Sequence, residues 1–430
     1  MLNKNQQSAR YAVMVGVNRH KKPCLMIENT KMKSPSGSPA EVFFAFLKLG
    51  LTSFGGPIAH LAYFRTEIVE RRRWLSDEQF GQLLALCQFL PGPASSQLGF
   101  TLGLLRAGWL GALAAFVVFT LPSVLLLVAF AAAMPLLNSA IGDAAVHGLK
   151  LVACAVVADA VLGMSKKLCS DALRRTIAVL SASALLLASS AFAQLAVVFV
   201  AAVIGASFIR EINAPENGRG FQIHYGPRVG GMLLVLFVGL LFGLPLIATG
   251  KPDFASVAEA FYRAGALVFG GGHVVLPLLQ DSVVSTGWVA PEQFLSGYGA
   301  SQAIPGPMFA FSAYLGAILS PLENTYLMAA TALVFIFLPG FLLVAGVLPF
   351  WGAVSRHPTA GRAIAGANAA VVGLLVAALY NPIFTSGITS SADLAIVVVG
   401  FGLLAVWRMS PLIVVLWCVI ASVSQLWLFP

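Results

Sequence analysis

Long apolar stretches, separated by short polar and often basic connections, occupy most of the chain after residue 42. An α-helix crosses the hydrocarbon core of a bilayer with about 20 apolar residues, so each stretch predicts a transmembrane helix. The sequence therefore predicts an all-α, polytopic membrane protein of about thirteen transmembrane helices. Their intervals are 43–64, 79–106, 109–134, 138–165, 174–190, 192–209, 229–248, 258–280, 292–318, 325–350, 360–384, 391–408 and 411–429.

The same proline-rich motif interrupts two of these stretches. It is Pro91-Gly92-Pro93 in the interval 79–106 and Pro305-Gly306-Pro307 in the interval 292–318. Proline removes a backbone donor and clashes with the preceding helical turn, so we expect each motif to break its helix. Non-helical backbone at membrane depth is tolerated only where protein or a water-filled cavity surrounds it. A duplicated broken helix therefore indicates the binding site of a transporter.

The two halves of the chain share an ordered set of short matches beyond this motif. Seven predicted crossings separate equivalent positions, so the second half should insert upside down, as in transporters with two inverted-topology repeats and broken helices. The matches are 46–50 with 261–265, Phe54-Gly55-Gly56 with Phe269-Gly270-Gly271, Trp74 with Trp288, 78–80 with 292–294, Gln88 with Gln302, and Pro122 with Pro339.

These matches divide the chain into four parts. We expect a disordered, basic cytoplasmic tail at 1–41, which lacks the apolar core of a secretory signal. The first repeat is 42–209, the linker 210–257 contains one extra transmembrane helix, and the second repeat is 258–430.

Composition and charge narrow the class of protein. The chain is 58% hydrophobic and 10% charged, against about 25% charged for soluble domains, which excludes a large soluble domain. The net charge of +9 gathers in the tail and in alternate connections, which favours membrane orientation over nucleic-acid binding. The positive-inside rule then predicts a cytoplasmic N-terminus and a C-terminus outside.

One basic connection contradicts this orientation. Arg65 and the run Arg71, Arg72 and Arg73 would lie outside if the interval 43–64 crossed the membrane. Either this segment is re-entrant, or the arginines have another task, such as concentrating anions at one mouth of a transport path. A solvated interfacial helix is the structural alternative.

The cysteines do not indicate redox or metal chemistry. The chain has five, without a C-x-x-C pair or a His/Cys cluster at metal-ligand spacing. We interpret them as small buried apolar residues. We therefore expect no metal, no cofactor and no enzymatic activity.

The ordered set of matches, present twice, resembles the chromate ion transporter family over about 42–430. The resemblance implies a secondary active transporter in the bacterial inner membrane that exports chromate and gives chromate resistance. Sulfate or another tetrahedral oxyanion is the alternative substrate, and a chromate reductase or an ion channel would be a protein of another class. The sequence leaves open whether the protein is a homo-oligomer. The second copy has Gly272 where the first has Pro57, so the halves are not equivalent.

Chromate is a tetrahedral dianion, so the protein must supply hydrogen-bond donors and positive potential within the bilayer. A half-helix begins after Pro93, and its free N–H groups together with Ser95, Ser96 and Gln97 form our candidate anion site. The second copy, 308–311, is apolar there.

Five further side chains are candidates for the anion path, each with a structural alternative. Gln88 and Gln302 can face the ion or satisfy carbonyls freed by the breaks. Lys48 and Arg263 occupy aligned positions and can line the path or extend to the headgroups. His60 can bind a proton or anion, or be a satisfied structural histidine.

The glycine-rich elements, Gly55, Gly56 and Pro57 with Gly270, Gly271 and Gly272, can interrupt the first helix of each repeat or permit close helix packing.

Asp159 is the clearest acidic residue within an apolar segment. It could carry a coupling proton, although its repeat counterpart is apolar.

Overall fold

The computed structural model describes residues 37–53, 56–137, 139–188, 191–210, 221, 223–269, 272–319, 324–354 and 358–428. The expected tail therefore lies almost entirely outside the described residues, as do Gly55, Gly270 and Gly271. All described helices belong to one unit, Ser36–Pro430. Within these residues the protein is all-helical and has no strand, which confirms the predicted fold class at this level.

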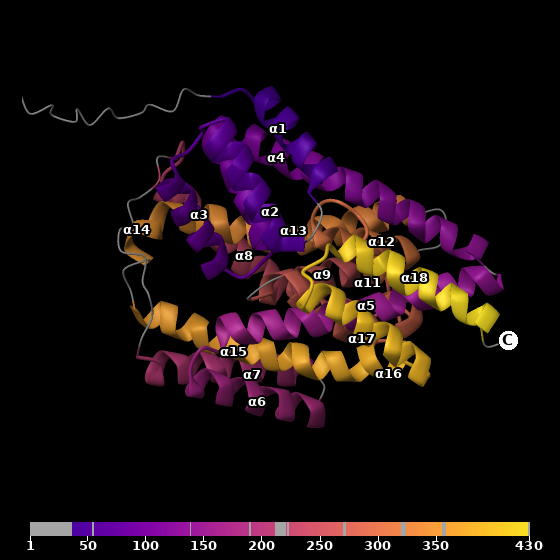
Figure 1. Ribbon diagram of the computed structural model, residues 1–430. Coiled ribbons are helices and arrows are strands. Elements are labelled where there is room, and N and C mark those ends of the chain that lie inside the picture. Colours follow the sequence, from indigo (N-terminus) through magenta and orange to yellow (C-terminus); the bar gives the residue numbers. More distant parts are fainter. Residues whose placement is uncertain are drawn as a thin grey trace, which may run out of the picture. The chain divides into compact units, whose positions relative to one another are not determined.

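The helices follow the order of the two predicted halves (Figure 1). Before the linker they are α1 (Pro39–Thr52), α2 (Gly56–Phe64), η1 (Arg65–Arg71), α3 (Asp77–Phe89), α4 (Ala94–Ala133), η2 (Met134–Leu137), α5 (Ala140–Leu168), α6 (Ala172–Leu187) and α7 (Ala191–Phe208). The linker contains α8 (Pro227–Ile247). After it come α9 (Phe254–Leu267), η3 (Gly272–Val274), α10 (Val275–Val283), α11 (Pro291–Ser301), η4 (Met308–Ala310), α12 (Phe311–Leu319), α13 (Thr325–Val347), η6 (Leu348–Phe350), α14 (Trp351–Val354), α15 (Pro358–Ala378), η7 (Leu379–Phe384), α16 (Thr385–Gly387), α17 (Ser391–Ala405) and α18 (Pro411–Leu428).

Both predicted helix breaks are present. Helix α3 ends at Phe89, and Leu90 is already extended, with ψ 149°, as expected before a proline. Gly92 has φ 123° and Gly306 has φ 100°, a backbone region in which glycine avoids the cost of a Cβ atom. Each Pro-Gly-Pro motif is therefore a sharp, non-helical turn between two helices.

The interrupted segments turn back on themselves. Lys48 and Glu67 are 19 residues apart, which in one continuous helix would separate them by roughly 28 Å. Their Nζ and Oε2 atoms are 2.9 Å apart, so α1 and α2 with η1 form a hairpin. In the second half, the Tyr314 hydroxyl donates to the Gln293 carbonyl at 2.9 Å across 21 residues. Helices α11 and α12 therefore also form a hairpin.

Two more contacts show the same reversal. The Arg106 guanidinium lies 5.2 Å from the ring centroid of Trp74, so α3 and the first part of α4 lie side by side. Arg263 on α9 and Asp281 on α10 line one small pocket, although they are 18 positions apart in the sequence. The structure does not confirm thirteen crossings, because the four intervals 43–64, 79–106, 258–280 and 292–318 are hairpins rather than through-going helices.

Helix α4 is itself two helices joined at a bend. Ala107 and Gly108 have non-helical backbone angles, and Gly108 has φ 63°. The bend lies between the predicted intervals 79–106 and 109–134, as the sequence indicated. The part of α4 after the bend, residues 109–133, is a long apolar helix.

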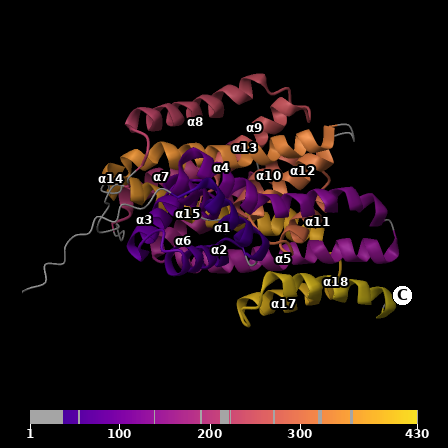
Figure 2. The same ribbon diagram turned by 90° about the horizontal axis from the view of Figure 1, so that it is seen from above.

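Among the described residues, five helices are long and apolar enough to cross a membrane. They are Ala94–Leu136, Ala140–Leu168, Pro227–Ile247, Thr325–Phe350 and Gly361–Gly387. Shorter apolar helices occur at Ala196–Phe208, Met308–Leu319, Ser391–Ala405 and Pro411–Leu426. In Figure 1, α15, α7 and α6 lie together along one edge of this unit, and in Figure 2, α17 and α18 run beside α5.

Corresponding helices pack in the same way in both halves. Helix α1 packs on α4, and α9 packs on α13. A Cβ atom on Gly50 would lie 2.9 Å from the Phe119 carbonyl oxygen, and one on Gly265 would overlap the Ile336 carbonyl oxygen. Gly50 and Gly265 are matched positions of the repeat, so each hairpin is seated on its neighbouring long helix through a residue without a side chain.

We expect Gly265→Ala to destabilise the protein by about 1–3 kcal/mol, because the added methyl group has no space against α13. The matched control is Gly163→Ala on α5, where a Cβ atom meets nothing within 4 Å. Thermal unfolding of the purified variants in detergent measures the difference. Equal midpoints for both variants would contradict the close packing of α9 on α13.

Candidate functional site

The two halves bind each other through their helix breaks. The Gly92 N–H donates to the Val268 carbonyl at 2.7 Å, and the Gly306 N–H donates to the Ser53 carbonyl at 2.9 Å. Gly92 matches Gly306 and Ser53 matches Val268 in the repeat, so the two bonds are equivalent and reciprocal. Each Pro-Gly-Pro turn is thus satisfied by the end of the first helix in the opposite half.

The matched prolines Pro122 and Pro339 are followed by different residues. The hydrogen bonds that close the two Pro-Gly-Pro turns differ as well. Ser123, after Pro122, donates from its hydroxyl to the Pro305 carbonyl at 2.6 Å. Its counterpart Gly340 has no side chain, and Gln97 takes over this role in the other turn. The Gln97 Nε2 group donates to the carbonyls of Pro91 at 2.9 Å and Gly340 at 3.1 Å. The candidate anion ligand Gln97 therefore has a structural task first.

Five buried polar atoms of the first half find no hydrogen-bond partner among the described residues. They are Ser53 Oγ, His60 Nδ1, Ser96 Oγ, Gln97 Oε1 and Thr120 Oγ1. All five residues are at most 4% exposed. Buried polar groups in native proteins are nearly always paired, and an unpaired one costs about 1–3 kcal/mol. Such a concentration beside one helix break points to a polar ligand.

Side-chain contacts connect these residues to one region. Ser96 lies one helical turn before Gly99, which packs against Phe46 and Phe64, and both of these rings contact Phe119. His60 Nε2 lies 3.1 Å from the Ser53 carbonyl, and its ring packs edge-on against Phe119 at 5.6 Å. Phe119 directly precedes Thr120, which shares a helix face with Ser123 because the two are three residues apart. The cluster therefore lies between the α1–α2 connection, the start of α4 and the middle of α4. We call it the polar cluster.

Three of the five atoms in the polar cluster can donate to an oxyanion, whereas Gln97 Oε1 can only accept a hydrogen bond. The hydroxyls of Ser53, Ser96 and Thr120 can each donate a hydrogen bond. His60 donates from Nε2 to a carbonyl, so its Nδ1 is an acceptor when the ring is neutral and a second donor when it is protonated. The first turn of α4 adds free backbone N–H groups and the positive end of its dipole. Ser95, also predicted, is buried on this same turn.

The remaining predicted ligands lie in different surroundings. Gln88 is exposed, whereas its match Gln302 is partly buried and donates to Ser301 Oγ at 3.2 Å. Lys48 is paired with Glu67, and Arg263 lies 2.8 Å from Glu259 Oε1 on its own helix. Neither cation is a bare charge in this structure. Pro57 and Gly56 begin α2, and Gly272 begins η3, so the glycine-rich elements do interrupt both first helices.

The arginine run is largely paired with acids. Glu67 is 6% exposed and accepts from Lys48, from Arg72 at 2.9 Å and from Arg71 at 3.4 Å. Burial opposes its ionisation, but the hydrogen bonds from Lys48 and Arg72 prevail and lower the pKa of Glu67. Arg65 pairs with Glu70 and with Asp77. Since residues 65–78 contain as many acids as arginines, the field that the run projects is mostly offset. Anion focusing by this run stays a prediction.

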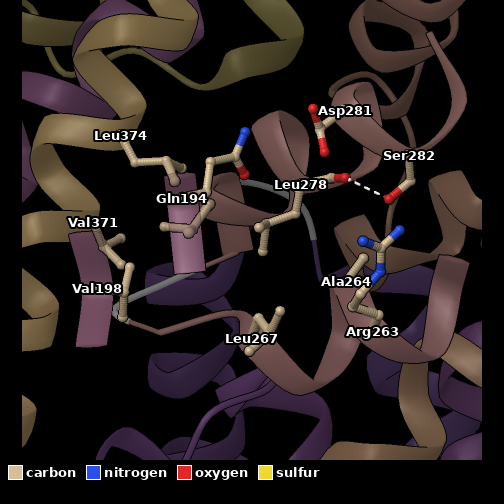
Figure 3. A pocket seen from close by; sticks show the side chains of 11 residues that line it. Gln194, Val198, Arg263, Ala264, Leu267, Leu278, Asp281, Ser282, Val371 and Leu374 are labelled. Atoms are coloured by element: carbon tan, nitrogen blue, oxygen red, sulfur yellow. Dashed lines mark hydrogen bonds between the residues drawn. The ribbon is translucent and has the colours of Figure 1, made fainter. Parts of the chain in front are cut away.

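A second polar region lies between helices of both halves. A cavity of about 380 Å³, which we call the vestibule, is bounded by the ends of α6 and α10, the start of α7 and the end of α15. It shares Gln194, Asp281 and Leu374 with a narrow pocket of about 30 Å³ that reaches Arg263 (Figure 3). The polar side chains of the vestibule include Gln194, Gln280, Asp281, Ser285, Asn381 and Ser386.

Sequence reasoning missed Ser53, Thr120, Glu67 and Asp281. Ser53 directly precedes the matched Phe54-Gly55-Gly56 element, and that repeat could have indicated it. The other three carry no local signal. Four of the five cysteines are buried and free as predicted, namely Cys87, Cys154, Cys169 and Cys418, and Cys24 lies outside the described residues. Among the described residues no group of three or more His, Cys, Asp or Glu could hold a metal ion.

Comparison with known proteins agrees with these features. The chromate transporter family matches residues 40–206 and 255–423. The chain is 27% identical over 391 residues to a probable chromate transport protein of Synechococcus elongatus, covering 89% of this chain and 94% of that one. It is also 27% identical over 363 residues to a chromate transport protein of Pseudomonas aeruginosa, covering 80% and 81%. No solved structure shows significant similarity to the chain. The protein belongs to the chromate transporter family, and it is a membrane transporter rather than an enzyme.

Proposed function

We propose that this protein is a secondary active transporter that exports chromate from the cytoplasm of a bacterium across its inner membrane. Family membership and the names of the relatives support chromate as the transported anion. The inside-negative potential favours outward movement of an anion, by about 2.3 kcal/mol per charge for each 100 mV. Sulfate, with the same shape and charge, is the alternative substrate.

The hairpins support a revised topology. If the four hairpins enter and leave on one side, nine helices cross: residues 109–133 of α4, then α5, α6, α7, α8, α13, α15, α17 and α18. The number is odd, so a cytoplasmic N-terminus still gives a C-terminus outside. Arg65 and Arg71 to Arg73 then lie in the cytoplasm with the other basic connections, as the positive-inside rule requires. The two halves, 42–209 and 258–430, have opposite orientations in this arrangement.

We place the transported anion at the polar cluster. The observation that carries this is the set of three buried, unpartnered hydroxyls of Ser53, Ser96 and Thr120 in the polar cluster. The matching region of the second half begins with Met308 and Phe309 and is apolar. The reciprocal bonds at Gly92 and Gly306 join the two breaks. Alternating access would then rock the hairpins of one half against those of the other around the anion.

The topology predicts which introduced cysteines a membrane-impermeant thiol reagent reaches from outside intact cells. Glu78→Cys, at an exposed position near the start of α3, should react only after permeabilisation. Lys251→Cys, exposed between α8 and α9, should react in intact cells. The four described native cysteines are buried and should give little background. Labelling of Glu78→Cys from outside would contradict this topology and would support a membrane crossing at 43–64.

The anion site predicts a loss of affinity in Ser96→Ala. A hydrogen bond to a charged group contributes about 1.5–3 kcal/mol, so chromate should bind roughly ten- to a hundredfold more weakly. Chromate and sulfate binding to purified protein, measured by calorimetry, tests this. The matched control is Ser312→Ala, a buried serine of the second half whose hydroxyl already donates to the Phe309 carbonyl at 2.8 Å.

Chromate transport by everted vesicles should be weaker in Ser96→Ala than in the parent and in Ser312→Ala. The proton gradient and the membrane potential are varied separately in this assay. Unchanged binding in Ser96→Ala, or an equal loss in Ser312→Ala, would refute the placement of the anion at the polar cluster. Flux that is independent of both gradients would count against secondary active transport. Stronger transport of sulfate than of chromate would favour the alternative substrate.

A further inference from the structure

The vestibule opens where three connections lie near one another. Its walls include Leu185 and Leu186 at the end of α6, Gln194 near the start of α7 and Pro291 at the start of α11. In the topology proposed above, all of these positions lie toward the outside. The vestibule is therefore a cavity through which water can reach the second half from the external side.

The narrow pocket continues from the vestibule toward the crossed helix breaks. Its lining includes Leu267 and Val274, which flank the interruption between α9 and α10. Val268, the first residue of that interruption, accepts the hydrogen bond from the Gly92 N–H. An ion at the inner end of the narrow pocket would thus lie close to the junction of the two halves. Arg263 is the cation on this route.

Two acidic side chains and one basic side chain lie along this route. Asp281 lines both the vestibule and the narrow pocket, and Figure 3 shows the Arg263 side chain directed toward Ser282 and Asp281. Glu259, 15% exposed at its side chain, pairs with Arg263 at 2.8 Å. From α7 and α15 the lining contributes only uncharged residues, and η7 contributes the Tyr380 hydroxyl. With both acids ionised the net charge is −1, which repels a dianion strongly in a medium of low dielectric constant.

We propose that Asp281 is the proton-binding group that admits an oxyanion to Arg263. When the Asp281 carboxylate takes up one proton, the net charge at the pocket rises to zero, and Arg263 can bind the anion. When Asp281 loses that proton, its charge expels the anion. The anion itself undergoes no covalent change. This inference rests on the proposed transport of oxyanions and adds a proton site to it.

The first half has the same charges in a different arrangement. Lys48 matches Arg263, and Glu67 matches Ser282, the neighbour of Asp281. Glu67 is bonded directly to Lys48, Arg71 and Arg72, which hold it in the ionised form. No ion pair of Asp281 within 4.0 Å is present among the described residues. Of these two acids, Asp281 is therefore the one that lies without an ion pair at the vestibule.

The test is the pH dependence of sulfate binding to the purified full-length protein. Sulfate stays a dianion between about pH 5.5 and 8, whereas chromate takes up a proton within that range. The affinity of the parent protein should rise as the pH falls, by up to about tenfold per pH unit while Asp281 is ionised in the free state. Asp281→Asn, which imitates the protonated acid, should bind as tightly as the parent does at low pH and should show little pH dependence.

Three further measurements make the result specific. Asp159→Asn removes an aspartate within α5, outside the vestibule lining, and should keep the pH dependence of the parent. Asp281→Glu retains an ionisable group, so its sulfate affinity should still depend on pH. This variant distinguishes an effect of titration from an effect of altered packing. In weakly buffered solution, sulfate should draw about one proton per bound anion into the parent and none into Asp281→Asn.

The outcomes distinguish this proposal from the proposed function. A parent protein with pH-dependent binding and an Asp281→Asn variant with the same slope would overturn the assignment of Asp281. Loss of the pH dependence in Asp159→Asn alone would assign the proton-binding site to Asp159 on α5. No binding of sulfate or chromate by the parent at any pH would overturn the proposed function, and this inference with it.

Discussion

The need to satisfy backbone groups inside the protein constrains this structure more than any side-chain contact. Two Pro-Gly-Pro turns and two glycine-rich interruptions leave N–H and C=O groups without helical partners. The chain resolves this by crossing over: Gly92 donates to Val268, and Gly306 donates to Ser53. Because each turn depends on the other half, neither repeat has a complete hydrogen-bond pattern alone. A change at one break therefore acts directly on the matching element of the other.

The crossed bonds are symmetric, but the side chains around them are not. Ser123 closes one turn with a single hydroxyl, whereas Gly340 leaves its place to Gln97, which reaches across from the start of α4. That exchange brings an amide into the same region as the unpartnered hydroxyls of Ser96 and Thr120. The second break is lined by aromatic and aliphatic groups such as Met308 and Phe309. The surroundings of the two breaks therefore differ: hydroxyl and amide groups lie beside the first, and apolar side chains line the second.

The sequence predicted the helix breaks because proline acts locally, and it predicted the repeat because the matched residues occur in the same order twice. Its apolar pattern could not predict that the broken segments turn back. A hairpin and a crossing have the same apolar length, and hydropathy does not report direction. The partner of Glu67 remained hidden for that reason: Lys48 and Glu67 meet only when 19 residues reverse. Gln88 and Gln302 looked equivalent by sequence, yet one is exposed and the other partly buried.

One sequence signal did anticipate the reversal. A through-going helix at 43–64 would have left Arg65 and the run Arg71 to Arg73 on the side opposite to the other basic connections. In the topology that we propose, the hairpin removes that conflict. Glu67 shows how this segment can hold so many cations: it is buried and accepts from three of them. An acid of this kind costs desolvation that only multiple hydrogen bonds can offset. In the second half, Asp281 lacks such bonds among the described residues and borders a polar cavity, which is why we assign the pH response to it.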